Sequence, residues 1–221
     1  MSHIKALIFD FDGLILETEG PIYQSWLELY ASYGVDLPLS TWSRIIGAGA
    51  DAFDPLQNLE AQVGHPLDLQ SIAPIQRARE RELIAAQPIR PGVEVYLADA
   101  RRLGLKVGLA SSSPCEWVTS YLAERRLITY FDCIRGRDDV RLAKPDPELY
   151  LSVLAALGVQ EDQAIAFEDS PNGVRAARAA GIFCVAVPTP LTRQLSLDQA
   201  DLQLDSLADL PLEKLLLLVT P

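Results

Sequence analysis

The chain has 221 residues, of which 49% are hydrophobic and 22% charged, with no low-complexity tract or internal repeat. This length suits one large domain or a core that carries an insertion, and the composition excludes a disordered protein. Nineteen Lys and Arg against thirty Asp and Glu give a formal charge of −11, which opposes binding to nucleic acid or to an anionic membrane surface.

The cysteines Cys115, Cys133 and Cys184 are far apart and show no spacing typical of a metal site. We expect reduced thiols that fill the core of a cytoplasmic protein. The apolar stretch Leu215–Val219 is far shorter than the roughly 20 residues that span a bilayer, so we expect no membrane anchor and no export signal.

Short apolar runs rich in β-forming residues alternate with helical patterns along the chain. This alternation predicts an α/β fold, with a Rossmann-like core built on a mostly parallel sheet. Ligands of such sheets bind at the carboxyl edge of the strands. The candidate strands are Lys5–Asp10, Lys106–Ala110, Ala164–Glu168 and Phe183–Val187, with weaker ones near Phe131–Ile134 and Leu202–Leu204.

The stretch between the first two confident strands is too long for a crossover and carries helical patterns. The expected helices there are Ile22–Tyr33, Thr41–Ile46, Ala52–Val63 and Leu69–Ala86. We therefore predict a core domain made of residues 1–16 and 89–221, and a small α-helical cap domain made of residues 17–88. Glycine and proline at Thr18–Pro21 and Gln87–Gly92 favour hinges at these two boundaries.

Three helix starts have a capping side chain directly before a proline: Ser113-Pro114, Asp146-Pro147 and Ser170-Pro171. The second start opens an amphipathic helix that ends at Gly158, a typical glycine stop. The alanine-rich segment Val174–Ala180 suits a helix that lies close against the sheet.

The first predicted strand ends in two carboxylates, Asp10 and Asp12, followed by Gly13. Residues i and i+2 of an extended chain point to the same side, so both carboxylates would face one reactive centre. Gly13 permits a turn in which backbone amides can approach an anion. Alternatively, an acidic strand end is simply the start of a loop.

Three further polar elements follow predicted strands or open helices. Hydroxyls and amides of Ser111–Ser113 suit phosphoryl oxygens, although helix capping is the favoured interpretation of this triplet alone. Lys144 can neutralise a phosphate and a neighbouring aspartate, or can be a solvated side chain. Glu168 and Asp169 offer the hard oxygen ligands that Mg²⁺ prefers, or they can complement the positive end of a helix.

The ordered set Asp10-x-Asp12, Ser111, Lys144 and Glu168-Asp169 resembles the four motifs of the haloacid-dehalogenase-like superfamily. The resemblance covers essentially the whole chain. It includes a helical cap inserted after the first motif, as in the subfamily of phosphatases and β-phosphoglucomutases. It implies a Mg²⁺-dependent phosphoric monoester hydrolase.

The resemblance also implies catalytic roles. Asp10 is expected to be the nucleophile that becomes an aspartyl phosphate, and Asp12 the general acid and base. Ser111 would hold the phosphoryl group and Lys144 would neutralise its charge. The presence of Asp12 argues against the dehalogenase branch of the superfamily.

For the ligand sites, the resemblance implies that Mg²⁺ lies between Asp10, the backbone carbonyl of Asp12 and Asp169. Glu168 would be a further ligand, either directly or through water. The substrate would contact two more residues of the core motifs, Gly13 and Ser112, and one residue of the cap, Arg44.

The cap departs from its relatives at two positions. Glu17 stands where many relatives have Asp, and Ile22 stands where β-phosphoglucomutases carry a histidine. Arg44 could contact a second anionic group of the substrate. A solvated helix face is the favoured interpretation of Arg77, Arg79 and Arg81.

We expect the partner to be a small phosphorylated metabolite, by family analogy a sugar phosphate. The first alternative is a β-phosphoglucomutase-like enzyme, against which Ile22 counts. A non-catalytic protein that binds a phosphorylated metabolite is the second alternative, although all four motifs are intact. We expect a monomer in preference to a homodimer.

Overall fold

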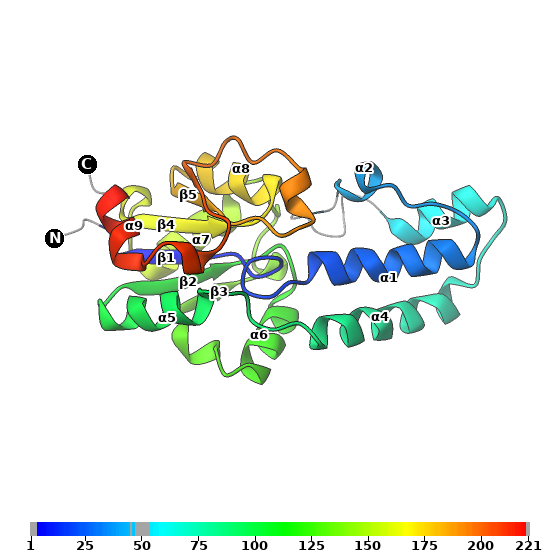
Figure 1. Cartoon of the computed structure of the whole chain (residues 1–221), viewed down its shortest axis with the longest axis horizontal. Helices are drawn as coiled ribbons and strands as arrows, with labels where there is room; N and C mark the ends of the chain where they lie inside the picture. The colour runs from blue at the N-terminus through cyan, green and yellow to red at the C-terminus, as the bar shows by residue number, and fades with distance from the viewer. Residues whose placement is uncertain (1–3, 45, 47–53, 220–221) are drawn as a thin grey trace.

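The computed structural model describes residues 4–44, 46 and 54–219 of the chain. Within these residues, six parallel strands form one sheet in the order β3-β2-β1-β4-β5-β6. The α/β fold class expected from the sequence is confirmed (Figure 1). The strands are β1 (Ala6–Phe9), β2 (Lys106–Ala110), β3 (Cys133–Arg135), β4 (Ala164–Glu168), β5 (Phe183–Ala186) and β6 (Leu202–Gln203).

Two helical layers cover the sheet, one on each face. Successive residues of a strand point to opposite faces, so each strand packs against both layers. In β1, Leu7 and Phe9 pack on one face, and Ala6 and Ile8 pack on the other. The first face is covered by α5 (Val93–Arg102), α6 (Cys115–Glu124) and α9 (Leu212–Val219). The second face is covered by α7 (Glu148–Leu157) and α8 (Pro171–Ala179).

Small residues let α7 and α8 approach the second face closely. The strands contribute several alanines there, and α8 contributes Ala176 and Ala177, all of them buried. In β2, a Cβ atom added to Gly108 would lie 2.4 Å from Cγ1 of Val153 in α7. The expected close packing of the alanine-rich helix is therefore present.

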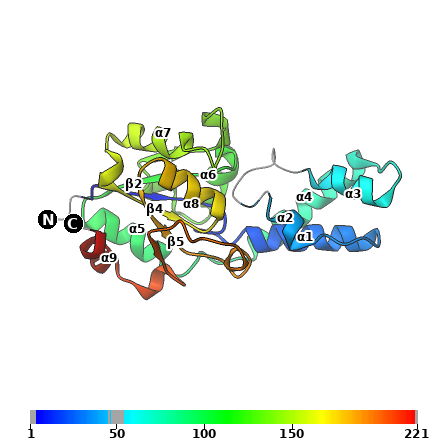
Figure 2. The ribbon, with the colours of Figure 1, turned by 90° about the horizontal axis from the view of Figure 1, so that it is seen from above.

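Helices of the segment that follows β1 form a second lobe beyond the carboxyl edge of the sheet (Figures 1 and 2). α1 and α4 run side by side there. This lobe has its own apolar cluster, which includes Trp26, Tyr30 and Trp42. The helices are α1 (Glu19–Ser32), α2 (Leu39–Trp42), α3 (Pro55–Val63) and α4 (Leu69–Ala85).

The two linkers between this lobe and the sheet, residues 14–18 and 86–92, run next to each other. Leu16 and Ile89 form an antiparallel bridge, and the amide of Arg90 donates to the carbonyl of Ile15 at 3.0 Å. A further contact between the lobes comes from α8, where Asn172 Nδ2 donates to the Ile46 carbonyl at 2.8 Å.

Of the three expected helix starts, the structure confirms one and changes two. Ser170 caps α8 by accepting from the amide of Gly173 at 3.0 Å. α7 begins one residue later than expected, at Glu148, whose amide donates to Asp146 at 3.0 Å. The expected cap Ser113 was wrong, because α6 begins at Cys115 and the Ser113 hydroxyl donates to Asp12 instead.

Short 3₁₀ turns complete the connections of the core: η2 (Ile128–Tyr130), η3 (Arg137–Asp139), η4 (Glu161–Gln163), η5 (Thr192–Gln194) and η6 (Leu207–Asp209). All three cysteines are free thiols; Cys133 and Cys184 are buried, and Cys115 is half-buried. Among the described residues, no helix combines the length and the apolar character needed to cross a lipid bilayer.

We predict that Gly108→Val lowers the free energy of unfolding by about 1–3 kcal/mol, because the new side chain collides with Val153 in a closely packed layer. Urea denaturation measures this change. The control is Gly20→Ala in the first turn of α1, where the nearest atom, Glu17 Oε1, lies 3.4 Å from the new Cβ. A control as destabilised as Gly108→Val would contradict this explanation.

Candidate active site

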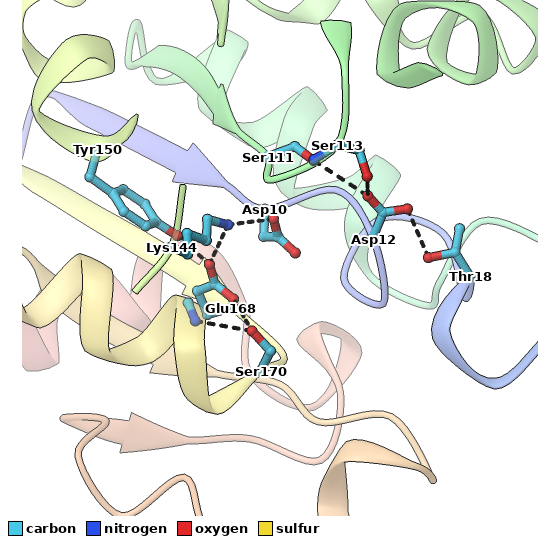
Figure 3. A network of polar contacts seen from close by, with 10 residues as sticks. Asp10, Asp12, Thr18, Ser111, Ser113, Lys144, Tyr150, Glu168 and Ser170 are labelled. Carbon is cyan, nitrogen blue, oxygen red and sulfur yellow. Dashed lines mark hydrogen bonds and ion pairs between the residues drawn. The ribbon is translucent and has the colours of Figure 1, made fainter. Parts of the chain in front are cut away.

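The candidate site lies at the carboxyl edge of the three central strands. Asp10 directly follows β1, Ser111 directly follows β2, and Glu168 and Asp169 lie at the end of β4. Because β1 lies between β2 and β4, these side chains gather around Asp10. Figure 3 shows Lys144 reaching into the same cluster.

Lys144 forms ion pairs with two carboxylates of the cluster. Its Nζ atom lies 2.5 Å from Oδ1 of Asp10 and 2.6 Å from Oε1 of Glu168, and all three side chains are buried. Burial alone lowers the pKa of Lys144, but the two carboxylates raise it above its ordinary value. Lys144 therefore stays protonated and supplies the positive charge expected from the sequence.

One ammonium group does not compensate all the negative charge here. Burial raises the pKa of Asp10 from its ordinary value of 3.8 to about 8; Lys144 opposes this rise, while Glu168 and Asp12 add to it. Burial, Asp10 and Glu168 also raise the pKa of Asp169 well above its ordinary value. The cluster thus disfavours its own fully ionised form.

Asp169 is the clearest sign that a cation belongs in this cluster. Its side chain is fully buried, and neither carboxylate oxygen has a hydrogen-bond partner in the part of the chain that the structure describes. One oxygen from each of Asp10, Glu168 and Asp169 lies within 4.8 Å of the other two. Unpartnered buried carboxylate oxygens at this spacing fit a hard divalent cation.

Gly13 makes room for Asp169. Its φ angle is +79°, and a Cβ atom at this position would lie 2.1 Å from Oδ2 of Asp169. Its amide donates to the Leu16 carbonyl at 2.8 Å, within the turn that follows β1. In this structure, Gly13 permits close approach of the chain to the acidic cluster.

Glu168 is held by residues that the sequence analysis did not identify. The Tyr150 hydroxyl in α7 donates to Oε1 at 2.6 Å, the oxygen that also accepts from Lys144. On the other side, Ser170 Oγ donates to Oε2 at 3.4 Å. The Glu168 carboxylate also lies so close to Gly173 that a Cβ atom on Gly173 would collide with it. The only sequence signal for Tyr150 is a phenol on the apolar face of an expected helix.

Asp12 points away from Lys144 and accepts from four donors (Figure 3). Thr18 Oγ1 at 2.9 Å and Trp117 Nε1 at 3.1 Å donate to Oδ1. Ser113 Oγ at 2.6 Å and Ser111 Oγ at 3.3 Å donate to Oδ2. The sequence analysis assigned Ser111 to the phosphoryl group and predicted none of these four hydrogen bonds to Asp12.

Arg90, in the second linker, is another residue that the sequence analysis missed. Its guanidinium donates to the Val187 and Pro188 carbonyls at 2.9 Å each and to the Gly13 carbonyl. It therefore joins the loops that follow β1 and β5. Its charge also opposes the rise in the pKa of Asp169.

The Glu17 side chain has a structural use. Oε1 of Glu17 accepts from the amide of Gly20 at 2.9 Å, in the first turn of α1. Thr18, the residue at the N-cap position, makes no capping bond because its hydroxyl donates to Asp12. The longer side chain of Glu17 thus stabilises the start of α1, where the N-cap residue Thr18 bonds to Asp12 instead of capping the helix.

The other two predicted substrate contacts, Ser112 and Arg44, lie in different surroundings. Ser112 lines a cavity of about 100 Å³, whereas Arg44 is exposed and does not line it. Residues 45 and 47–53, which flank Arg44 and Ile46, lie outside the described residues. The arginines of α4 fit the expected solvated face, since Arg79 pairs with Glu28 and Glu82. The cavity is lined by Asp10, Asp12, Ile22, Ser111–Ser113, Trp117 and Glu19.

Known proteins resemble this chain over nearly its full length. It is 45% identical over 213 residues to "Putative phosphatase YhcW" of Bacillus subtilis (strain 168), and the match covers 96% of each chain. It is 32% identical over 216 residues to hexitol phosphatase B of Escherichia coli (strain K12), which covers 96% of this chain and 97% of that protein.

A solved structure shows the same architecture. A mutant of CbbY from Rhodobacter sphaeroides, in complex with xylulose-(1,5)-bisphosphate, matches with a TM-score of 0.74 and 29% identity over 94% of this chain and 96% of that one. A family model of haloacid dehalogenase-like hydrolases matches residues 4–181. The chain therefore belongs to the haloacid dehalogenase-like hydrolases, and within that family it is a phosphoric monoester hydrolase.

Proposed function

We propose that this chain is a Mg²⁺-dependent phosphatase that hydrolyses a small phosphorylated metabolite, a sugar phosphate, through an aspartyl phosphate on Asp10. The observation that carries this proposal is the pair of buried Asp169 oxygens, which have no partner among the described residues and lie close to Asp10 and Glu168. The names of the relatives, one a hexitol phosphatase and one bound to a sugar bisphosphate, support the substrate class.

Asp10, Glu168 and Asp169 would hold Mg²⁺, together with the backbone carbonyl of Asp12. When bound, the ion supplies positive charge that keeps the carboxylates ionised and neutralises phosphoryl oxygens. Lys144 already lies against Asp10 and would offset the charge that remains on the phosphoryl group.

The reaction divides into two transfers. In the first, a carboxylate oxygen of Asp10 forms a bond to phosphorus while the bond to the leaving oxygen breaks, and Asp12 gives that oxygen a proton. In the second, water attacks phosphorus, Asp12 takes a proton from the water, and the bond between Asp10 and phosphorus breaks. Free phosphate leaves, and both aspartates return to their initial state.

The cavity beside Asp10 holds little more than a phosphoryl group, since its volume is about 100 Å³. We propose that the organic part of the substrate lies between the two lobes, beside the cavity. We propose that residues 17–88 form the cap, which moves about the paired linkers to admit the substrate and to exclude water. A cytoplasmic location agrees with the free thiols.

A phosphosugar mutase remains the main alternative. It would have to return the phosphoryl group to a sugar instead of to water. Ile22, which stands in place of the mutase histidine, lines the cavity with an apolar side chain that neither gives nor takes a proton. Hydrolysis is therefore the better supported reaction.

We predict that Asp10→Asn lowers phosphate release to below about 0.1% of the wild-type rate, because the amide is a poor nucleophile. A panel of phosphorylated sugars and p-nitrophenyl phosphate with Mg²⁺, followed by colorimetric phosphate detection, measures this rate. The matched control is Asp36→Asn, which changes an exposed carboxylate. Turnover that survives in a folded Asp10→Asn protein would remove Asp10 as nucleophile.

The same panel decides between the alternatives. With β-glucose 1-phosphate and a trace of bisphosphate, we expect free phosphate; glucose 6-phosphate as the product would instead establish a mutase. If the wild-type protein binds phosphorylated sugars but turns over none, the non-catalytic alternative holds.

We predict that Mg²⁺ stabilises the protein more at pH 8.5 than at pH 6. In the metal-free fold the pKa of Asp10 is raised from 3.8 to about 8, so the folded state binds the extra proton. The stability that this proton contributes is complete below about pH 4 and is lost as the pH rises through about 8. A cation that replaces the proton then adds about 2.7 kcal/mol at 100 times its Kd.

Thermal melts with EDTA or MgCl₂ at the two pH values measure this increment. Asp169→Asn should lose the increment at both pH values, whereas Asp36→Asn should keep it. An increment that is equal at both pH values, or larger at pH 6, would show that the cation does not compete with protons in this cluster.

A further inference from the structure

Trp117, in the first turn of α6, contacts Asp12 through its indole N–H. Nε1 lies 3.1 Å from Oδ1, and the half-buried ring lines the cavity beside Asp10. Neither the sequence motifs nor the fold alone assigns this residue a role.

The indole differs from the other donors to Asp12. Thr18, Ser111 and Ser113 donate through hydroxyls, which can rotate to other acceptors. An indole N–H has one direction and cannot accept, so it offers the carboxylate a single fixed position. Of the four donors, Trp117 therefore restricts the orientation of Asp12 most strongly.

The position of the ring is itself fixed by packing. Tyr121, one turn later in α6, meets the Trp117 ring edge-on, with centroids 4.9 Å apart and an interplanar angle of 67°. Tyr121 also packs on Phe11, at 6.3 Å. Since Phe11 precedes Asp12, both the backbone and the side chain of the aspartate are tied to α6.

We propose that Trp117 is a positioning residue that orients Asp12 toward the leaving oxygen of the substrate. This proposal rests on the proposed function, in which Asp12 gives a proton to that oxygen while the bond between it and phosphorus breaks. Proton transfer requires that the carboxyl oxygen of Asp12 lie within hydrogen-bond distance of the leaving oxygen. A carboxyl group that is free to turn is therefore a weaker acid catalyst.

The leaving group supplies a test that a purely structural role would not meet. An alkoxide of a sugar is strongly basic and needs the proton to leave. The phenolate of p-nitrophenyl phosphate is weakly basic and leaves without it. A change that misorients Asp12 must therefore slow the alkyl substrate selectively.

The experiment measures kcat/KM with Mg²⁺ for p-nitrophenyl phosphate and for the sugar phosphate that the panel shows to be turned over fastest. This ratio reports only the steps up to departure of the leaving group, so the later hydrolysis of the aspartyl phosphate does not mask the effect. Trp117→Phe keeps an apolar ring and removes the donor.

We expect Trp117→Phe to lower kcat/KM for the sugar phosphate by about tenfold or more, and for p-nitrophenyl phosphate by less than about threefold. Asp12→Asn should show the same selectivity in stronger form. Tyr121→Phe, which keeps the ring against Trp117, should leave the ratio between the two substrates unchanged. Equal losses for both substrates in Trp117→Phe would overturn the proposal.

A second variant covers the case in which Trp117→Phe does not fold. Benzothienylalanine incorporated at position 117 keeps the shape of the indole and replaces only its N–H by sulfur. It should reproduce the selective loss, and an unchanged ratio would overturn the proposal. If the wild-type protein turns over neither substrate, or Asp10→Asn keeps its activity, the proposed function itself fails.

Discussion

The structure depends on one electrostatic constraint, which is the burial of three carboxylates around a single ammonium group. Lys144 satisfies one oxygen of Asp10 and one of Glu168, and no described residue satisfies Asp169. A fold does not retain unpartnered buried charge unless something compensates it. The arrangement therefore fits a cation, which would compensate the charge that Lys144 leaves unbalanced.

The sheet and its small residues bring this charge together. Parallel strands end at one edge, so residues that are far apart in sequence meet there without any long-range signal. Gly13 and Gly173 then let the chain approach carboxylates at distances that a side chain would forbid. Parallel pairing of β4 with β1, with Phe9 opposite Phe167, places Glu168 and Asp169 directly beside Asp10.

The sequence predicted those features that are local. β1, β2 and β4 follow from short apolar runs. Asp10 and Asp169 follow from motifs at strand ends, and Lys144 follows from the motif before α7. The sequence did not predict contacts that need tertiary packing: Trp117 is 105 residues from Asp12, and Arg90 is 77 residues from Gly13. Ser113 was misassigned for a related reason. A serine before Pro114 has the same local signature whether it caps a helix or donates to a distant carboxylate.

The two linkers connect the helical lobe to the residues of the candidate site. Thr18 belongs to the first linker and donates to Asp12, while Arg90 belongs to the second and donates to Gly13. The linkers are bonded to each other between these residues. Thr18 stands at the start of α1 in the helical lobe, whereas Trp117 belongs to α6, which packs on the sheet. The Asp12 carboxylate is thus held from two sides, by Thr18 at the start of the helical lobe and by Trp117 beside the sheet.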